Sequence, residues 1–213
     1  MSAAIEQALA AALASGARCF GQISIERSKK GFVLRHRDDE GGDGLQEFRR
    51  TEDAIEIAKF DDAGNYRPLK TEPNLRHGWR MELVDLSETA GALNYFYPGR
   101  LAALNAWKQK QLSMTPLRET LDRQSGMYRV AAKISDDQID DVVGNFCRSD
   151  GGCLRTILWK RDGRGTVPST KLPAEKFDPA HDQTGCGEAA IPLLCQEACN
   201  LLVNECRKVV KSE

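Results

Sequence analysis

Cysteine is distributed unevenly along this chain of 213 residues, and that distribution constrains the fold more than any other feature. Six of the seven cysteines lie at or after Cys147. Four of these six form two tight pairs, one with five residues between its members and one with three: Cys147, Cys153, Cys195 and Cys199. Cysteines in close pairs are typical of a metal centre. The sequence therefore predicts that the last third of the chain folds around a metal.

Composition favours a protein that keeps its cysteines reduced. Hydrophobic residues make up 41% of the chain and the net charge is −1, so a packed core is expected, and neither nucleic acid nor a membrane surface is an expected partner. No apolar run is long enough to cross a bilayer. Residues 1–16 show helical spacing and lack the basic start of a signal peptide. We expect a cytoplasmic protein, in which clustered cysteines indicate a metal more than disulfides.

The first 125 residues predict a small α+β unit. Alternation and β-forming residues predict strands at 18–26, 31–36, 45–50 and 78–84. Helical spacing and capping residues predict helices at 3–14, 51–60, 85–93, 99–112 and 117–123. The two histidines of this unit, His36 and His77, are far apart in sequence, and we expect each to be a surface or packing residue. No Ser/His/Asp set, P-loop or dinucleotide-binding glycine motif indicates a catalytic site.

A second small α+β unit is predicted over residues 126–213. Its expected elements are a strand at 127–134, a helix at 135–146, a strand at 156–159, a long loop at 161–185 and a final helix at 194–211. Apolar residues recur at helical spacing in the helix at 135–146, so that it would deliver Cys147 at its end. A unit this short is marginal on hydrophobic burial alone. Metal ligation would therefore add to its stability.

The predicted elements bring the cysteine pairs into positions that suit metal ligation. Cys195 and Cys199 are four residues apart, so on the predicted final helix both sulfurs would point to one face near the helix N-terminus. The exposed N–H groups and the dipole there favour thiolate. The other pair flanks Gly151 and Gly152, which let the backbone curl so that its amides donate to sulfur.

Cysteine spacing also distinguishes between metals. Structural zinc sites favour cysteines separated by two residues, whereas separations of five and three suit an iron–sulfur cluster better. We interpret the four cysteines as ligands of a 4Fe–4S cluster. Arg148 and Arg155 lie close to the first pair and would either offset the negative charge of the cluster or be ordinary surface residues. A cluster with four thiolate ligands has no vacant iron, which argues against substrate chemistry at the metal.

The remaining cysteines have other expected roles. Cys206 lies seven residues beyond Cys199, about 10.5 Å along a continuous helix, so we expect a buried core thiol and not a ligand. Cys186, in Thr-Gly-Cys-Gly-Glu, would either replace a ligand or be free. Cys19 is expected in the core of the first unit.

Residues Thr115 to Val130, Thr-Pro-Leu-Arg-Glu-Thr-Leu-Asp-Arg-Gln-Ser-Gly-Met-Tyr-Arg-Val, followed by the cysteine pairs, resemble the C-terminal half of sirohydrochlorin cobaltochelatase-like proteins of the CbiX type. In that family a chelatase-type domain precedes a stabilising module and a 4Fe–4S cluster-binding domain. Tyr97-Pro98, with Trp107 beyond it, is similar to the stabilising module. The resemblance implies a stabilising domain over 1–125, a cluster domain over 126–213, and these cluster ligands: Cys147, Cys153, Cys195 and Cys199. The chelatase domain has no counterpart here, so the resemblance does not carry chelatase activity over.

Two functions are consistent with these patterns. The first is a 4Fe–4S protein in electron transfer or redox sensing, with a redox protein or a tetrapyrrole enzyme as its partner. The alternative is a structural module, stabilised by a cluster or by zinc, that binds a partner without redox chemistry. We expect a coloured protein with a broad visible absorption band for the first and a colourless, zinc-loaded protein for the second.

Overall fold

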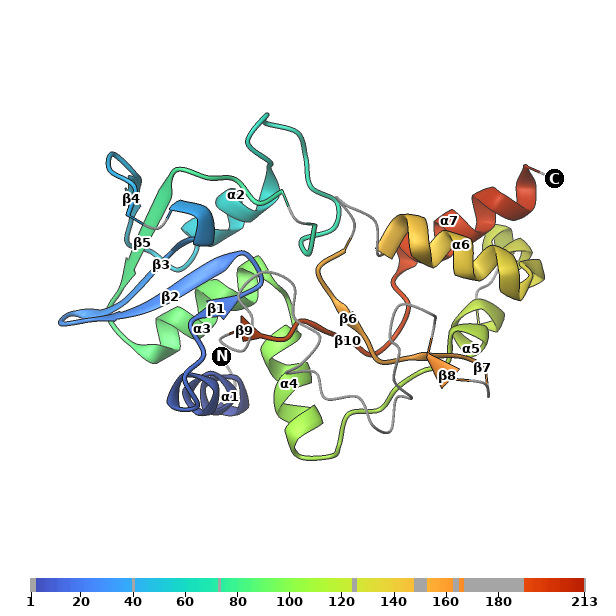
Figure 1. Cartoon of the computed structure of the whole chain (residues 1–213), viewed down its shortest axis with the longest axis horizontal. Helices are drawn as coiled ribbons and strands as arrows, with labels where there is room; N and C mark the ends of the chain where they lie inside the picture. Colours follow the sequence, from blue (N-terminus) through green and yellow to red (C-terminus); the bar gives the residue numbers. More distant parts are fainter. Residues whose placement is uncertain are drawn as a thin grey trace. The chain divides into compact units, whose positions relative to one another are not determined.

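The computed structural model of the protein forms two compact units (Figure 1). The first contains the described parts of Met1–Gln111 and Pro179–Leu193, and the second those of Leu112–Asp178 and Leu194–Glu213. The first boundary lies after Gln111, ahead of the position chosen from the sequence, residue 125. The structure describes residues 3–39, 41–72, 74–123, 126–147, 153–162, 165–166 and 190–212, with side chains left out at 126–128, 160–162 and 165–166.

Both units combine helices with strands, so the predicted α+β class is confirmed. Among the described helices, none has the length and apolar character that a membrane span needs.

A six-stranded mixed sheet forms the centre of the first unit, with strand order β4-β5-β3-β2-β1-β9. Neighbouring strands run antiparallel except for the parallel pairs β4–β5 and β1–β9 at the two edges. The strands are β1 (Cys19–Phe20), β2 (Ile23–Ser28), β3 (Gly31–His36), β4 (Gln46–Phe48), β5 (Trp79–Leu83) and β9 (Ala190–Ile191). In β5 the residues are buried and half-buried in strict alternation, as its sequence predicts.

Helices pack beside this sheet and beside one another (Figure 1). They are α1 (Ala3–Ala14), α2 (Asp53–Lys59), α3 (Leu86–Phe96) and α4 (Arg100–Lys108). Helix α3 contacts β3 and β5 as well as α1 and α2. Trp79 of β5 stacks on Phe96 of α3 with ring centroids 5.1 Å apart, and both side chains are buried. The apolar side of the sheet is thus closed by aromatic packing.

Tyr97, just after α3, connects the helices to the first strands. Its ring meets Phe20 edge-on at 5.2 Å, and its hydroxyl accepts a hydrogen bond from the backbone N–H of Gln22 at 2.9 Å. Gly21 turns the chain at φ +59°, and a Cβ there would lie 2.6 Å from the Tyr97 ring. Only glycine fits both the backbone conformation and this close approach. Burial raises the pKa of Tyr97 to about 12, although the hydrogen bond from Gln22 acts in the opposite direction.

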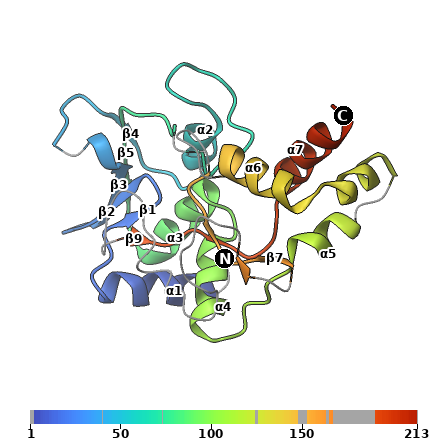
Figure 2. The ribbon, with the colours of Figure 1, turned by 45° about the vertical axis from the view of Figure 1, so that its right-hand side comes forward.

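The second unit is mainly helical. Its helices are α5 (Leu117–Asp122), η2 (Gly126–Lys133), α6 (Asp136–Cys147) and α7 (Asn200–Lys211). Two short sheets accompany them: β6 (Thr156–Ile157) pairs in parallel with β10 (Leu194–Cys195), and β7 (Lys160–Asp162) pairs with β8 (Gly165–Thr166). Helices α6 and α7 pack against each other and lie side by side in Figure 2. Their apolar stripes, together with Trp159 and Ile157, form one core.

Helix α6 begins at the capping residue expected from the sequence. The backbone N–H of Gln138 donates to the hydroxyl of Ser135, and the Gln138 side chain accepts from the Ser135 N–H. This reciprocal arrangement satisfies two of the free donors at a helix start. Arg118 of α5 reinforces the same end, because its guanidinium donates to the carbonyl of Ile134 and to the carboxylate of Asp136.

The predicted strand at 127–134 is wrong, because the chain forms the 3-10 helix η2 there. Ala131 and Ile134 are both buried, and a spacing of three residues matches the three-residue turn of a 3-10 helix. A strand would have placed these two side chains on opposite faces. The guanidinium of Arg118 donates hydrogen bonds to the carbonyls of Ala132 and Ile134, and these bonds also favour the observed helical turn over a strand.

The predicted start of the final helix near Leu194 is also wrong, since α7 begins at Asn200. Leu194 pairs with Thr156 across the β10–β6 sheet, and the carbonyl of Cys195 accepts a hydrogen bond from the N–H of Leu158 at 2.9 Å. Residues 193–195 are all buried, as in a short strand packed on both sides. Pro192, just before them, lacks an N–H. Residues 194–195 pair with β6, and the carbonyl of Cys195 bonds to Leu158 just after β6 instead of to a residue of a helix.

Candidate metal centre

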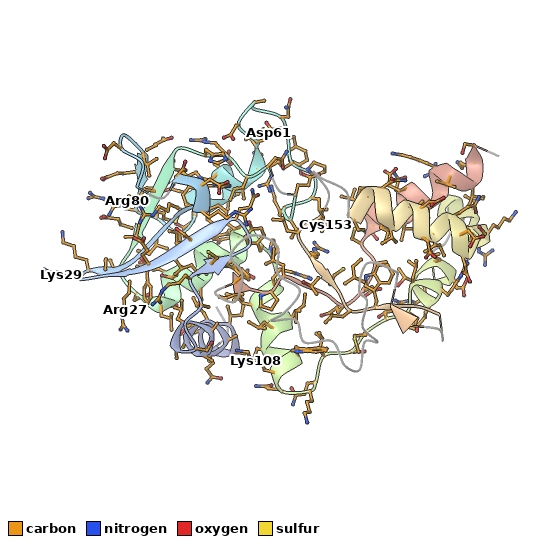
Figure 3. The ribbon with its side chains drawn as sticks, in the orientation of Figure 1. Arg27, Lys29, Asp61, Arg80, Lys108 and Cys153 are labelled. Atoms are coloured by element: carbon orange, nitrogen blue, oxygen red, sulfur yellow. The ribbon has the colours of Figure 1, made fainter. Side chains whose placement is uncertain are left out.

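The first cysteine pair lies at the end of helix α6. Cys147 is the last residue of that helix, and its carbonyl accepts a hydrogen bond from the N–H of Cys153 at 3.3 Å. The two residues are therefore held close at the backbone. Neither cysteine is in a disulfide, and both are half-buried. Cys153 lies just ahead of β6 (Figure 3).

The second pair spans the junction between β10 and α7. Cys195 ends the strand and is buried, whereas Cys199 is the residue that precedes the first turn of α7 and is half-buried. The prediction that both lie on one face of one helix is thus wrong, because Cys195 belongs to strand β10, which pairs with β6. The position of Cys199 at a helix N-terminus is confirmed, and its side chain makes no capping hydrogen bond. Its sulfur therefore meets the positive end of the helix dipole, which favours thiolate.

Arg155 lies among the thiols of both pairs. It is half-buried and comes two residues after Cys153. Burial alone lowers the pKa of its guanidinium, but Cys195, Cys153 and Cys199, with a hydrogen bond to Cys195, raise it, and the net direction is upward. One cation is thus shared by three of the four cysteines. This position fits the charge-offsetting role considered for Arg155, whereas Arg148 lies outside the described residues.

Trp159 is a neighbour of the site that sequence reasoning missed. It is fully buried in the core of the second unit, and its indole N–H donates to the sulfur of Cys195 at 3.3 Å. A buried indole N–H needs an acceptor, and a thiolate is a strong one. The signal that could have revealed it was a tryptophan at the end of the predicted strand 156–159, six residues after Cys153.

Two further cysteines are set apart from these four. Cys206 is buried on α7, and burial raises the pKa of its thiol to about 11. It is therefore a protonated core thiol at neutral pH, in line with the prediction. Cys19 is buried in β1 and is disulfide-bonded, which the sequence did not lead us to expect. Cys186 lies outside the described residues.

The donor set and its surroundings fit an iron–sulfur cluster. Four cysteines outside any disulfide come from one compact unit, a guanidinium lies beside three of them, and an indole N–H reaches the most buried one. Thiolates, cationic side chains and N–H donors to sulfur are the environment in which such clusters are bound. Fold and site together fit a small α+β protein of the iron–sulfur class.

Comparison with known proteins gives the family. Residues 5–111 match the DR2241 stabilising domain, and residues 109–208 match a 4Fe-4S iron-sulfur cluster binding domain. The chain belongs to the family defined by these two adjoining domains, and it binds a 4Fe–4S cluster through the second of them. The family expected from the resemblance and the expected cofactor are both confirmed.

One solved structure shows the same fold over the whole chain. It is DR2241 from Deinococcus radiodurans, described as a multi-domain protein with structural similarity to chelatases and with two additional novel domains. The identity is 29% and the TM-score 0.77, and the match covers 100% of this chain but 43% of that one. The chain therefore spans less than half the length of this relative. No curated protein matches the sequence.

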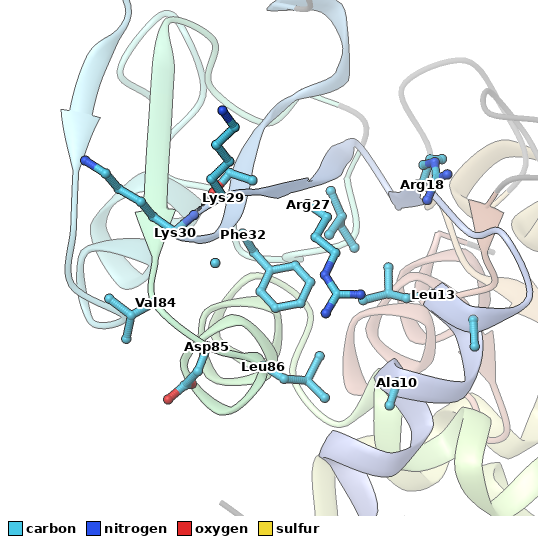
Figure 4. Close-up of a pocket in the computed structure, with 14 residues that line it drawn as sticks. Ala10, Leu13, Arg18, Arg27, Lys29, Lys30, Phe32, Val84, Asp85 and Leu86 are labelled. Carbon is cyan, nitrogen blue, oxygen red and sulfur yellow. Dashed lines mark hydrogen bonds between the residues drawn. The ribbon is translucent and has the colours of Figure 1, made fainter.

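A basic cavity in the first unit is separate from the cysteines. It has a volume of about 930 Å³ and lies between α1, the β2–β3 hairpin and the start of α3 (Figure 4). Its walls combine apolar groups, such as Phe32 and Leu86, with cationic side chains and one acidic residue: Arg18, Arg27, Lys29, Lys30 and Asp85. The Arg27 guanidinium lies beside the Phe32 ring in Figure 4. None of the residues that line this cavity is a cysteine.

Proposed function

We propose that Cys147, Cys153, Cys195 and Cys199 hold the 4Fe–4S cluster and that the protein transfers single electrons, or senses redox state, for a protein partner. When bound, such a cluster accepts and releases one electron. The four cysteines lie in the second unit, inside the matched cluster-binding domain, and none of them is in a disulfide. Cys206 is fully buried on α7 and the pKa of its thiol is raised to about 11, so it is not included.

The observation that carries the redox proposal is the pair of groups directed at Cys195. The Trp159 indole donates a hydrogen bond to its sulfur, and the Arg155 guanidinium is hydrogen-bonded to it as well. Reduction adds negative charge, so donors and cations at a ligand sulfur stabilise the reduced form more than the oxidised form. Both residues therefore raise the reduction potential. A site that served folding alone would gain nothing from this difference between oxidation states.

A reduction-potential measurement on the cluster-loaded protein tests this function. We expect Trp159→Phe to lower the potential by roughly 40 mV, the equivalent of one lost hydrogen bond of about 1 kcal/mol. Arg155→Gln should lower it further, because it removes a charge. Trp79→Phe is the matched control, since it changes a buried tryptophan of the first unit. Unchanged potentials in both Trp159→Phe and Arg155→Gln would instead support a structural module without redox function.

The partner proposed for this chemistry is an enzyme that acts on tetrapyrroles. The support is the solved relative, a multi-domain protein with structural similarity to chelatases and two additional domains. Size-exclusion chromatography of the cluster-loaded chain with a chelatase-like enzyme from the same genome tests it, with the apoprotein as control. Separate elution of both forms from that enzyme would reject this partner. The expected location is the cytoplasm, where cysteines that ligate a metal stay reduced, although Cys19 is disulfide-bonded.

The basic cavity supports the tetrapyrrole connection by its chemistry. A tetrapyrrole with several carboxylates offers a flat apolar body and an anionic rim, and the cavity offers apolar walls and four cations. Its volume of about 930 Å³ is within the range of small-molecule sites. We expect a polycarboxylated porphyrin to bind and Arg27→Gln to weaken it by roughly tenfold, as for the loss of a charged hydrogen bond. Arg80→Gln, outside the cavity, is the control, and equal binding by both variants would reject the site.

A further inference from the structure

Two histidines that are distant in sequence meet at one end of the first sheet. His36 is the last residue of β3, and His77 lies just before β5. These strands pair antiparallel with Arg35 opposite Arg80, so the pairing brings the end of one strand next to the start of the other. The two imidazole rings are 3.7 Å apart between centroids and tilted by 47°. His36 is buried and His77 is exposed, as expected of a packing and a surface residue, and the strand register brings their rings together despite their distance in sequence.

The Asp38 carboxylate lies near both rings. His36, Asp38 and His77 each offer one ligand atom, a ring nitrogen or a carboxylate oxygen, and these atoms lie within 4.8 Å of one another. The Asp38 carboxylate is 3.7 Å from Nδ1 of His36, and its side chain is 60% exposed. The group therefore consists of a buried imidazole, a half-exposed imidazole and an accessible carboxylate, which gives an ion a route from solvent.

His36 supplies an observation of its own. Its ring is fully buried, and Nδ1 accepts the backbone N–H of Asp38 at 3.2 Å, but Nε2 has no hydrogen-bond partner among the residues that the structure describes. A buried polar atom without a partner is destabilising, so a ligand that bound it would remove that cost. Imidazole nitrogens are common ligands of transition metal ions.

His77 is surrounded by carboxylates that would orient it. Nδ1 lies 3.4 Å from Asp39, and Nε2 lies 3.7 Å from Asp62. Both carboxylates also hold the backbone, because Asp39 accepts the N–H of Gly78 at 2.8 Å and Asp62 accepts the N–H of His77 at 2.5 Å. A ligating histidine commonly donates its second ring N–H to such a carboxylate, which fixes the ring and strengthens the metal bond.

We propose that His36, Asp38 and His77 form a binding site for a divalent first-row transition metal ion of the Zn²⁺ type. Two imidazoles and one carboxylate are the ligands that suit zinc and its neighbours, whereas calcium and magnesium prefer sites of oxygen alone. Three protein ligands leave a further position for water or another ligand. The site lies in the first unit, so it is distinct from the cysteine site and uses none of its residues.

The charges around the group favour a cation. Asp38, Asp39 and Asp62 face the two rings, and Arg37, whose Nε lies 3.6 Å from the Asp38 carboxylate, is the one cation near them among the described residues that affect His36. Three carboxylates exceed one guanidinium in charge, so an added divalent ion meets a negative field.

Zinc binding to the cluster-loaded full chain tests the proposal. Equilibrium dialysis against Zn²⁺, followed by elemental analysis of zinc and iron, gives the zinc bound per chain at a known cluster content. We expect His77→Gln and Asp38→Asn each to weaken the binding of one zinc ion by more than about tenfold. Both residues are substantially exposed, so their variants should fold. Asp43→Asn, an exposed acid of the neighbouring loop, is the matched control and should bind zinc as the parent does.

A thermal-unfolding measurement is the second readout. Zinc should raise the unfolding midpoint of the parent and of Asp43→Asn, and it should raise the midpoint less in His77→Gln, since a ligand stabilises only the state that binds it. The proposal is overturned if the parent takes up no zinc beyond that of His77→Gln. It is equally overturned if Asp43→Asn loses zinc to the same extent, since general acidity would then explain the binding.

Discussion

Each of the two units of this protein is stabilised in a different way. The first has a six-stranded sheet, and large side chains such as Trp79, Phe96 and Tyr97 fill the space between sheet and helices. The second has only short two-stranded sheets, and its core is formed mainly by helices that end or begin at cysteines. Apolar burial dominates in the first unit, which also has a disulfide at Cys19, whereas we expect the second unit to gain much of its stability when its thiols are tied together by the cluster.

The largest effect is expected from serine substitutions at the four proposed ligands, which should remove the cluster from the second unit. Each of Cys147→Ser, Cys153→Ser, Cys195→Ser and Cys199→Ser should abolish most of the cluster, because a hydroxyl is a poor substitute for thiolate. Iron and sulfide analysis after anaerobic purification measures the loss. Circular dichroism should still show the sheet of the first unit. Full cluster content in Cys199→Ser, with loss in Cys206→Ser, would reverse the assignment of those two residues.

Removal of the cluster should have the second-largest effect, because it should destabilise the second unit and leave the first unit unchanged. We expect hydrogen exchange of the α7 amides, Asn200–Lys211, to accelerate roughly a thousandfold, about 4 kcal/mol, since a structural metal contributes folding free energy directly. Amides of β3 and β5 serve as the internal control and should keep their protection. Limited proteolysis should likewise cut the second unit first. Equal protection of α7 with and without cluster would mean that the second unit is as self-sufficient as the first.

Alkaline pH should affect the first unit through Tyr97. Burial raises its pKa to about 12, whereas tyrosine in an unfolded chain titrates near 10. The unfolded chain therefore loses this proton first as the pH rises, and stability falls between about pH 10 and 12 by up to about 2 to 3 kcal/mol. Below pH 10 this contribution is fully present. Urea unfolding at pH 9 and 11 should show a smaller pH effect in Tyr97→Phe, and an identical drop in both proteins would contradict the role of Tyr97.

The smallest effect is expected at Cys206. Cys206→Ser should retain the cluster but lower the stability of the second unit by about 1 to 2 kcal/mol, since a hydroxyl is more costly than a thiol in an apolar core. Because burial raises the pKa of this thiol to about 11, it should also react slowly with alkylating reagents at pH 8 in the folded protein. Mass spectrometry after brief alkylation measures this. Rapid labelling of Cys206 would show that the core of the second unit opens readily.

The sequence predicted elements whose pattern is local and missed those formed by distant pairing. The alternation in residues 78–84 and the capping residue Ser135 are local signals, and both predictions are confirmed. The two-residue strands β9 and β10 have no pattern of their own, because each exists only through its partner strand. A buried run that includes Leu194 satisfies helix and strand periodicity equally well, so its assignment depended on pairing that the sequence does not reveal.

The sequence offered the cysteines of the proposed site and a possible charge-offsetting role for Arg155, but not the contact from Trp159. Paired cysteines indicate metal by identity alone, so the cofactor followed from their spacing and from the family resemblance. The approach of Trp159 to Cys195, and of Arg155 to three thiols, depends on how β6 and β10 pair. For the same reason the contact between His36 and His77 could not be foreseen, because it arises from the register of β3 with β5.

Strand β9 has a consequence for the order in which the protein can be completed during synthesis. The first sheet acquires this edge strand from residues 190–191, and these pair with Cys19 and Phe20 near the other end of the chain. A ribosome delivers the N-terminal part first, so the nascent sheet must wait, with β1 as an exposed edge, until residues 190–191 have been translated. An open edge strand invites pairing with other chains. The interval between the emergence of β1 and that of β9 is therefore the period in which the growing protein is most exposed to aggregation.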